Sequence, residues 1–315
     1  MARPLRIEYP GAFYHVTSRG NEQKDVFKSH KDREKFLSYL ESASERYGAA
    51  IHAWCLMSNH YHLLLETPSG NLSQIMRHIN GAYTTYFNIK RKRAGHLFQG
   101  RYKAILVEAD AYAAELSRYI HLNPVRAGMV ARPEEYRWSS YQGYLGQIQA
   151  PEWLKRYLIL GSFDRNVTVA EHKYRSFVED LLTRDYDSPL KGVVASTVLG
   201  SRGFVEEITG SHLKGTSFDR SVPAVRKLTT RPMLEEIVTN VNTLLGEGEE
   251  FRRSVSIYCC QKFSGAKLKE IGAYFGISDA AVSQTSRRLV LKAEQDREIR
   301  RLLDRIEEQM KRVRS

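Results

Sequence analysis

The stretch Met57-Ser58-Asn59-His60-Tyr61-His62-Leu63-Leu64-Leu65-Glu66 decides how the first half of this chain folds. It is an apolar, strand-like run that carries two imidazoles two residues apart. Because side chains alternate between the two faces of a strand, His60 and His62 point the same way and Tyr61 points the other way. Two imidazoles on one face can share a metal ion. The alternative is that one histidine packs in the core while the other is solvated.

The segments around this strand predict an α+β fold. Aromatic and β-branched residues mark four strands, and apolar residues at helical spacing mark three helices. The predicted strands are 13–18, 49–57, 60–66 and 102–107. The predicted helices are 30–47, 71–89 and 110–122. Asn71 or Ser73 is expected to cap the second helix and Asp110 the third, which must stop near Asn123 because a proline follows. Short connections then favour an antiparallel sheet with helices on one face.

A second stretch, Arg118-Tyr119-Ile120-His121-Leu122-Asn123-Pro124-Val125-Arg126-Ala127-Gly128, adds a candidate nucleophile. Tyr119 and Asn123 are four residues apart on the third helix, so they lie on one face. If that face covers the strand, then His60, His62 and the Asn123 carbonyl oxygen supply three ligands for Mg²⁺ or Mn²⁺. Either ring nitrogen of His60, Nε2 or Nδ1, can serve.

A tyrosine that attacks at neutral pH needs a positive charge nearby, because a phenol has an ordinary pKa of about 10. The metal ion or one of three cations, Arg118, Lys103 and Arg126, is expected to supply that charge. The sequence does not choose among them. His15 stands alone in the first strand, and we interpret it as a structural residue.

Positive charge is concentrated at the two ends of the chain, whose net charge is +12. Residues 1–150 carry 20 Lys and Arg against 13 Asp and Glu, residues 151–250 carry 13 against 15, and residues 251–315 carry 15 against 8. This distribution suits nucleic acid, the commonest polyanion of a cytosol, although ordinary solubilising charge is the alternative.

Cations interleaved with aromatic residues also suit single-stranded DNA, since cations follow the phosphates and rings stack on bases. Tyr83 and Phe87 fit this pattern and fit a buried core equally well. The predicted DNA-binding residues of the first half are Arg19, Asn21, Lys90, Arg91, Lys92, Arg93, Arg101 and Lys103.

Nothing in the composition indicates export or a membrane. No stretch approaches the roughly 18 apolar residues of a membrane helix, and no apolar run follows the first residues. Cys55, Cys259 and Cys260 have neither disulfide nor zinc spacing, so we expect buried, reduced thiols. A cytoplasmic, nucleoid-associated protein is the expected outcome.

Four motifs in a fixed order resemble the REP-associated tyrosine transposases, relatives of the single-tyrosine HUH transposases of simple bacterial insertion sequences. The motifs are residues 14–21, 56–65, 95–103 and 119–128. The resemblance covers about residues 5–145, including 136–141. It departs at Ser58, where proline is common in relatives, and at His121, where relatives usually carry an acidic residue.

This resemblance implies a ferredoxin-like HUH nuclease core in residues 1–147 that nicks and rejoins hairpin-containing single-stranded DNA. Tyr119 is then the nucleophile that forms a 5′-phosphotyrosine, while His60, His62 and Asn123 hold the divalent metal. Insertion-sequence relatives are dimers that exchange catalytic helices, whereas REP-associated members act as monomers. We therefore expect a monomer, with a dimer as the alternative.

The remainder of the chain reads as helical. Residues 148–230 are expected to be an all-α connector with a linker at 210–222, and residues 293–315 an amphipathic helix that docks on its own protein. Residues 231–292 resemble the helix-turn-helix DNA-binding domain of the replication initiator DnaA, without its Asp-His-Thr-Thr-Val signature. The candidate duplex-DNA contacts there are Ser283, Gln284, Arg287 and Arg288.

Two functions follow from this interpretation. The first is a metal-dependent enzyme that nicks and transfers strands of hairpin DNA. The second is a domesticated, non-catalytic DNA-binding regulator that uses the helix-turn-helix domain. The intact set of Tyr119, His60, His62 and Asn123 favours the enzyme, because a protein that only binds DNA has no need of a nucleophile beside metal ligands.

Overall fold

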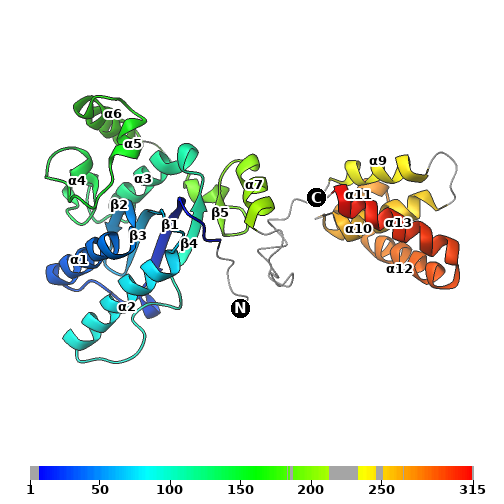
Figure 1. Ribbon diagram of the computed structural model, residues 1–315, viewed down its shortest axis with the longest axis horizontal. Coiled ribbons are helices and arrows are strands. Elements are labelled where there is room, and N and C mark those ends of the chain that lie inside the picture. The colour runs from blue at the N-terminus through cyan, green and yellow to red at the C-terminus, as the bar shows by residue number, and fades with distance from the viewer. Residues whose placement is uncertain are drawn as a thin grey trace. The chain divides into compact units, whose positions relative to one another are not determined.

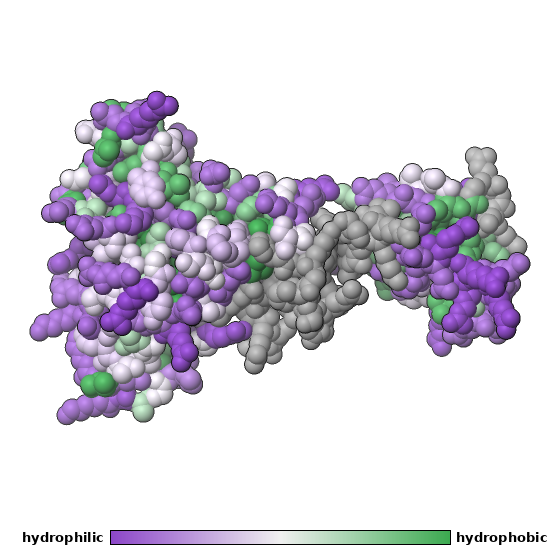
Figure 2. Space-filling model, viewed as in Figure 1, coloured by the Kyte–Doolittle hydropathy of each residue, from purple (hydrophilic) through white to green (hydrophobic). Residues whose placement is uncertain are grey.

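The computed structural model describes residues 7–182, 184, 187–212, 233–245, 251–264 and 266–313. It contains two compact units, Met1–Leu228 and Thr229–Ser315 (Figure 1). Each unit has its own hydrophobic core. Most of the predicted linker at 210–222 lies outside the described residues. The visible face of each unit is mostly hydrophilic (Figure 2).

A five-stranded sheet forms the centre of the first unit, in the order β2-β3-β1-β4-β5. Its strands are β1 (Ala12–Arg19), β2 (Ala50–Leu56), β3 (His60–Thr67), β4 (Lys103–Val107) and β5 (Val198–Leu199). The first four pair antiparallel, as the sequence predicts. β5 pairs parallel with β4, so the expectation of an all-α connector is wrong. A strand of two residues has no periodicity to reveal it.

Helices cover both faces of the sheet, which corrects the prediction of helices on one face. They are α1 (His30–Tyr47), α2 (Leu72–Lys90) and α3 (Ala109–Arg126). The ring of Tyr61 contacts Phe36 of α1, and its hydroxyl donates to Asn80 of α2. The next residue, His62, contacts Tyr119 of α3. Since neighbouring strand residues point to opposite faces, α3 lies opposite α1 and α2.

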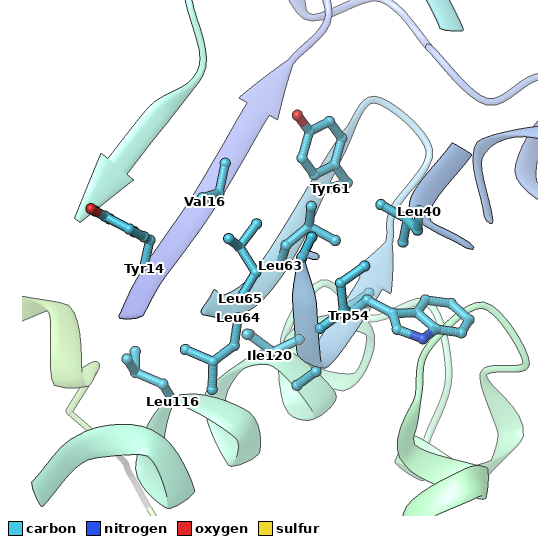
Figure 3. Close-up of a cluster of buried hydrophobic side chains, with 14 of the residues drawn as sticks. Tyr14, Val16, Leu40, Trp54, Tyr61, Leu63, Leu64, Leu65, Leu116 and Ile120 are labelled. Atoms are coloured by element: carbon cyan, nitrogen blue, oxygen red, sulfur yellow. The ribbon is translucent and has the colours of Figure 1, made fainter. Parts of the chain in front are cut away.

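The composition of β3 explains this two-sided covering. Tyr61, Leu63 and Leu65 are fully buried on one face, and Leu64 is fully buried on the other. Leu64 points toward α3, which presents Leu116 and Ile120 (Figure 3). A strand that is apolar on both faces belongs inside a covered sheet.

Helix α3 differs from its prediction at both ends. Glu108 rather than Asp110 is the N-cap residue, and the helix passes through Pro124 to Arg126. Proline removes only its own N–H, and the ladder resumes when the Ala127 N–H donates to the Asn123 carbonyl at 3.0 Å. Leu122 and Pro124 are buried, so packing outweighs the local bias of the residue before proline.

The residues that follow α3 belong to the same core as the sheet. They form η2 (Pro133–Glu135), α4 (Tyr141–Tyr144), α5 (Tyr157–Gly161), α6 (Val167–Glu179), η3 (Pro189–Gly192) and α7 (Arg202–His212). One further short helix, η1 (Asn21–Gln23), lies between β1 and α1. Tyr174 of α6 is fully buried among them, and the continuous core reaches Ile208 of α7.

The second unit is helical throughout its described residues. Its helices are α9 (Leu234–Leu245), α10 (Arg252–Phe263), α11 (Leu268–Phe275), α12 (Asp279–Gln295) and α13 (Arg297–Val313). Gly276 ends α11 in the left-handed conformation, and the Ser278 hydroxyl caps α12 by accepting from the Ala281 N–H. Leu303, Ile306 and Met310 are buried, so α13 packs on its own unit.

The three cysteines are free and buried, as expected. None of the described helices is both long enough and apolar enough to cross a membrane.

Candidate active site

The two histidines of β3 lie side by side at the end of the sheet where β1 ends and β3 begins. Arg19 pairs with His60, and Thr17 pairs with His62. The centroids of the two imidazoles are 5.1 Å apart, and the rings are nearly perpendicular. His62 is buried with 6% exposure, whereas His60 is half-buried.

Both imidazoles are neutral at pH 7. Burial, with a smaller contribution from Arg19, lowers the pKa of His60 to about 4. Burial together with the neighbouring His15, His60 and Arg19 lowers the pKa of His62 well below its usual range. A neutral imidazole keeps a lone pair on one nitrogen, and this is the form that binds metal ions.

Each histidine makes one hydrogen bond through Nδ1. His60 Nδ1 lies 2.6 Å from Asn59 Oδ1, and His62 Nδ1 lies 3.0 Å from His15 Nε2. The Nδ1 atoms are therefore engaged, which leaves Nε2 as the available nitrogen of each ring.

His15 is the residue of this cluster that the sequence interpretation missed. It is 1% exposed, and its ring lies within 8° of parallel to that of His62. Burial lowers its pKa to about 4. His15 and Thr17 are two residues apart on β1, so their side chains lie on the same face of the strand. Only the antiparallel pairing of β1 with β3 places that face beside His62.

Helix α3 places the candidate nucleophile over the histidines. The Tyr119 ring lies 5.8 Å from that of His62 and 6.0 Å from that of His15, edge-on to both. Asn123 Nδ2 donates to the Tyr119 carbonyl at 2.7 Å. Among the described residues Asn123 makes no hydrogen bond to either histidine of β3, and its Oδ1 has no partner.

Of the three cations considered for the phenol, Arg126 is the one beside it. Its guanidinium carbon lies 5.3 Å from the centre of the Tyr119 ring. Arg118 turns away, since it pairs with Glu115 and donates to the Phe177 carbonyl at 3.0 Å. Lys103 is exposed on β4.

The predicted donors to a metal ion are two neutral imidazoles and one amide oxygen. Within the described ranges, no group of three or more His, Cys, Asp or Glu side chains is arranged to hold a metal. A divalent ion at this site would therefore rely on His60, His62 and Asn123, with the remaining positions left to substrate oxygens and water.

The predicted DNA-binding cations of the first unit divide into two groups. Lys90 and Arg91 each lie 2.6 Å from a carboxylate oxygen of the buried Asp32, so they tie the end of α2 to the start of α1. Tyr83 and Phe87 are fully buried and take the core role. The other predicted residues, which have no ion pair to Asp32, are all exposed: Arg19, Asn21, Lys92, Arg93, Arg101 and Lys103.

In the second unit, the candidate contacts lie on α12. Gln284, Arg287 and Arg288 are exposed, and Ser283 is half-buried. The turn before α12 lies close to α11, as Gly272 shows: a Cβ at this position would lie 2.6 Å from the Ile277 carbonyl oxygen. Glycine at position 272 therefore lets the backbone of the turn approach α11 closely.

Comparison with known protein families gives a match to part of the first unit. Residues 9–123, a segment that begins shortly before β1 and ends at Asn123, match the family described as "Transposase IS200 like". The matched segment contains Tyr119 and both histidines of β3.

Among solved structures, the chain is similar to one described as "Structure of the REP associates tyrosine transposase bound to a REP hairpin". The sequence identity is 17%, the match covers 48% of this chain and 89% of that chain, and the TM-score is 0.42. A search of curated proteins finds no match.

Proposed function

We propose that this protein is a metal-dependent endonuclease and strand transferase that nicks and rejoins hairpin-containing single-stranded DNA. The observation that carries the proposal is the packing of the Tyr119 ring against His62, with both residues inside the segment that matches the IS200-like transposase family. The preference for REP-like hairpins rests on the order of the four sequence motifs.

The chemistry is a transfer of one phosphodiester bond. The Tyr119 oxygen forms a bond to phosphorus, and the bond from phosphorus to the 3′ oxygen breaks. The phenol gives its proton to solvent, the 3′ oxygen takes one up, and the 5′ end stays attached as a phosphotyrosine. Rejoining is the reverse attack by a 3′ hydroxyl, so no nucleotide is consumed.

The residues around Tyr119 have distinct parts in this scheme. Arg126 faces the ring, where a positive charge attracts the negative charge that develops on the phenol oxygen. His60, His62 and Asn123 would hold Mg²⁺ or Mn²⁺, which supplies Lewis-acid polarisation of the phosphodiester when bound. The exposed cations of the same unit suit the phosphates of the strand.

The test is covalent adduct formation with labelled hairpin oligonucleotides in Mn²⁺, followed on a denaturing gel. Tyr119→Phe should abolish the adduct and leave hairpin binding within about threefold. Tyr112→Phe, on the same helix, is the matched control and should form the adduct normally. An adduct that survives Tyr119→Phe would refute the assignment of the nucleophile.

The alternative function is a non-catalytic regulator that binds duplex DNA through a helix-turn-helix domain, and the exposed Arg287 and Arg288 on α12 favour such contacts. We propose duplex binding by this unit in either case. Arg287→Ala with Arg288→Ala should weaken duplex binding and reduce its salt slope by about two, without changing cleavage of a short hairpin. Loss of cleavage in this variant would contradict the division of labour.

A further inference from the structure

The two histidines of β3 share one arrangement, in which a neighbour occupies Nδ1 and no described residue hydrogen-bonds to Nε2. Asn59 is the neighbour of His60, and His15 is the neighbour of His62. These two partners have no role in the chemistry proposed above. Their chemistry nevertheless limits which nitrogen of each ring can carry the hydrogen.

For His60, the position of the hydrogen follows directly from the partner. A carbonyl oxygen can only accept, so the hydrogen lies on His60 Nδ1 and points at Asn59 Oδ1. The orientation of that amide is fixed because Asn59 Nδ2 donates to the Gln23 carbonyl at 2.9 Å. The lone pair of His60 is therefore on Nε2.

For His62, the partner is a second imidazole, so two arrangements satisfy the hydrogen bond. If His62 Nδ1 donates to His15 Nε2, the lone pair of His62 is on Nε2, as in His60. If His15 donates instead, His62 Nε2 carries a hydrogen and has no lone pair for a metal ion. The nearly parallel rings and the 3.0 Å separation suit an in-plane N–H···N bond in either direction.

We infer that Asn59 and His15 are positioning residues, which hold His60 and His62 with hydrogen on Nδ1 and with Nε2 directed to a divalent cation. This inference rests on the proposed function, because the metal role of His62 selects the direction of the second bond. Ligating histidines regularly donate their other N–H to an acceptor, which fixes the tautomer and the ring orientation.

The first experiment reads the tautomers directly. Long-range ¹H–¹⁵N correlation spectra of the ¹⁵N-labelled, metal-free protein at pH 7.5 distinguish Nδ1–H from Nε2–H imidazoles, and His60→Ala and His62→Ala assign the signals. We expect both rings as Nδ1–H tautomers. The more common Nε2–H form at either ring would overturn the inference for that ring.

The second experiment measures Mn²⁺ affinity by electron paramagnetic resonance, independently of cleavage. His15→Leu removes the acceptor and should weaken Mn²⁺ binding about tenfold or more. His15→Gln places an amide oxygen where it can accept and should stay within about threefold of the natural protein. Unchanged affinity in His15→Leu, or equal losses in both variants, would refute the role of His15. Thermal unfolding of each variant shows that it is folded.

The failure of this inference and that of the proposed function give different results. If His62→Ala leaves Mn²⁺ binding unchanged, the metal site itself is wrong and the proposed function fails. If His62→Ala abolishes binding while His15→Leu does not weaken it, the metal site stands and only the positioning role of His15 is lost.

Discussion

A buried chain of hydrogen bonds supports α3, the helix that carries Tyr119. Removing one oxygen atom, the Tyr174 hydroxyl, tests how much this chain contributes to stability. His121 Nδ1 lies 2.7 Å from the Tyr174 hydroxyl, and His121 Nε2 lies 2.7 Å from Ser140 Oγ. The Tyr174 hydroxyl is also 2.8 Å from Ser117 Oγ. The chain thus joins α3 to α6 and to the segment beside β2.

The directions of these bonds determine what Tyr174→Phe removes. Ser117 Oγ donates to the Ala114 carbonyl, so Tyr174 donates to Ser117 and accepts from His121 Nδ1. The phenylalanine ring fills the same space, but it leaves the His121 N–H buried without an acceptor. Burial lowers the pKa of His121 to about 3, so the ring stays neutral and does not escape by protonation near pH 7.

An unsatisfied buried donor costs about 1–3 kcal/mol, so we expect Tyr174→Phe to lower the free energy of unfolding by about 2 kcal/mol. For a unit of this size that corresponds to a fall in Tm of about 4–8 °C. Urea and thermal unfolding, followed by circular dichroism, measure both quantities.

Tyr157→Phe is the matched control, because Tyr157 is 71% exposed. Its free energy of unfolding should stay within about 0.5 kcal/mol of that of the natural protein. If Tyr174→Phe and Tyr157→Phe unfold at the same midpoint, the hydrogen-bonded chain does not stabilise the first unit and the reasoning fails.

Three further predictions concern other contacts. Burial alone would raise the pKa of Asp32, but its two cationic partners lower that pKa below the ordinary 3.8. Asp32→Asn should therefore lower the free energy of unfolding by about 2 kcal/mol at pH 7. In urea titrations, the difference in stability between this variant and the natural protein should shrink as the pH falls below about 4, because Asp32 then becomes protonated. Arg126→Gln should slow adduct formation by Tyr119 about tenfold or more while Arg126→Lys retains more of the rate, as single-turnover gels will show. Gly272→Ala should lower the free energy of unfolding of the second unit by about 1–3 kcal/mol, because the added methyl group meets the Ile277 carbonyl oxygen. An unchanged free energy in urea unfolding would show that the turn shifts to accommodate the methyl group at no cost.

The features that the sequence predicts well are local ones. His60 and His62 share a face because strand alternation needs no knowledge of the neighbours. The end of α1 at Gly48 is equally local, since that glycine adopts the left-handed conformation that closes the helix. These parts of the fold follow from one segment at a time.

The features that the sequence did not reveal depend on contacts between distant segments. His15 of β1 contacts His62 of the neighbouring strand β3, and Asp32 of α1 pairs with Lys90 and Arg91 at the end of α2. β5 is too short to have a pattern and is recognised only by its pairing with β4. In each case the partner lies more than forty residues away.

The core of the first unit extends well past the segment that matches the transposase family. His121 lies inside that segment, but its partners Ser140 and Tyr174 lie beyond residue 123, and apolar packing continues to Ile208. A shortened protein ending at residue 123 would thus expose the outer side of α3 to water and lose the bonds that support it. The smallest piece expected to fold and be expressed in soluble form therefore ends after α7.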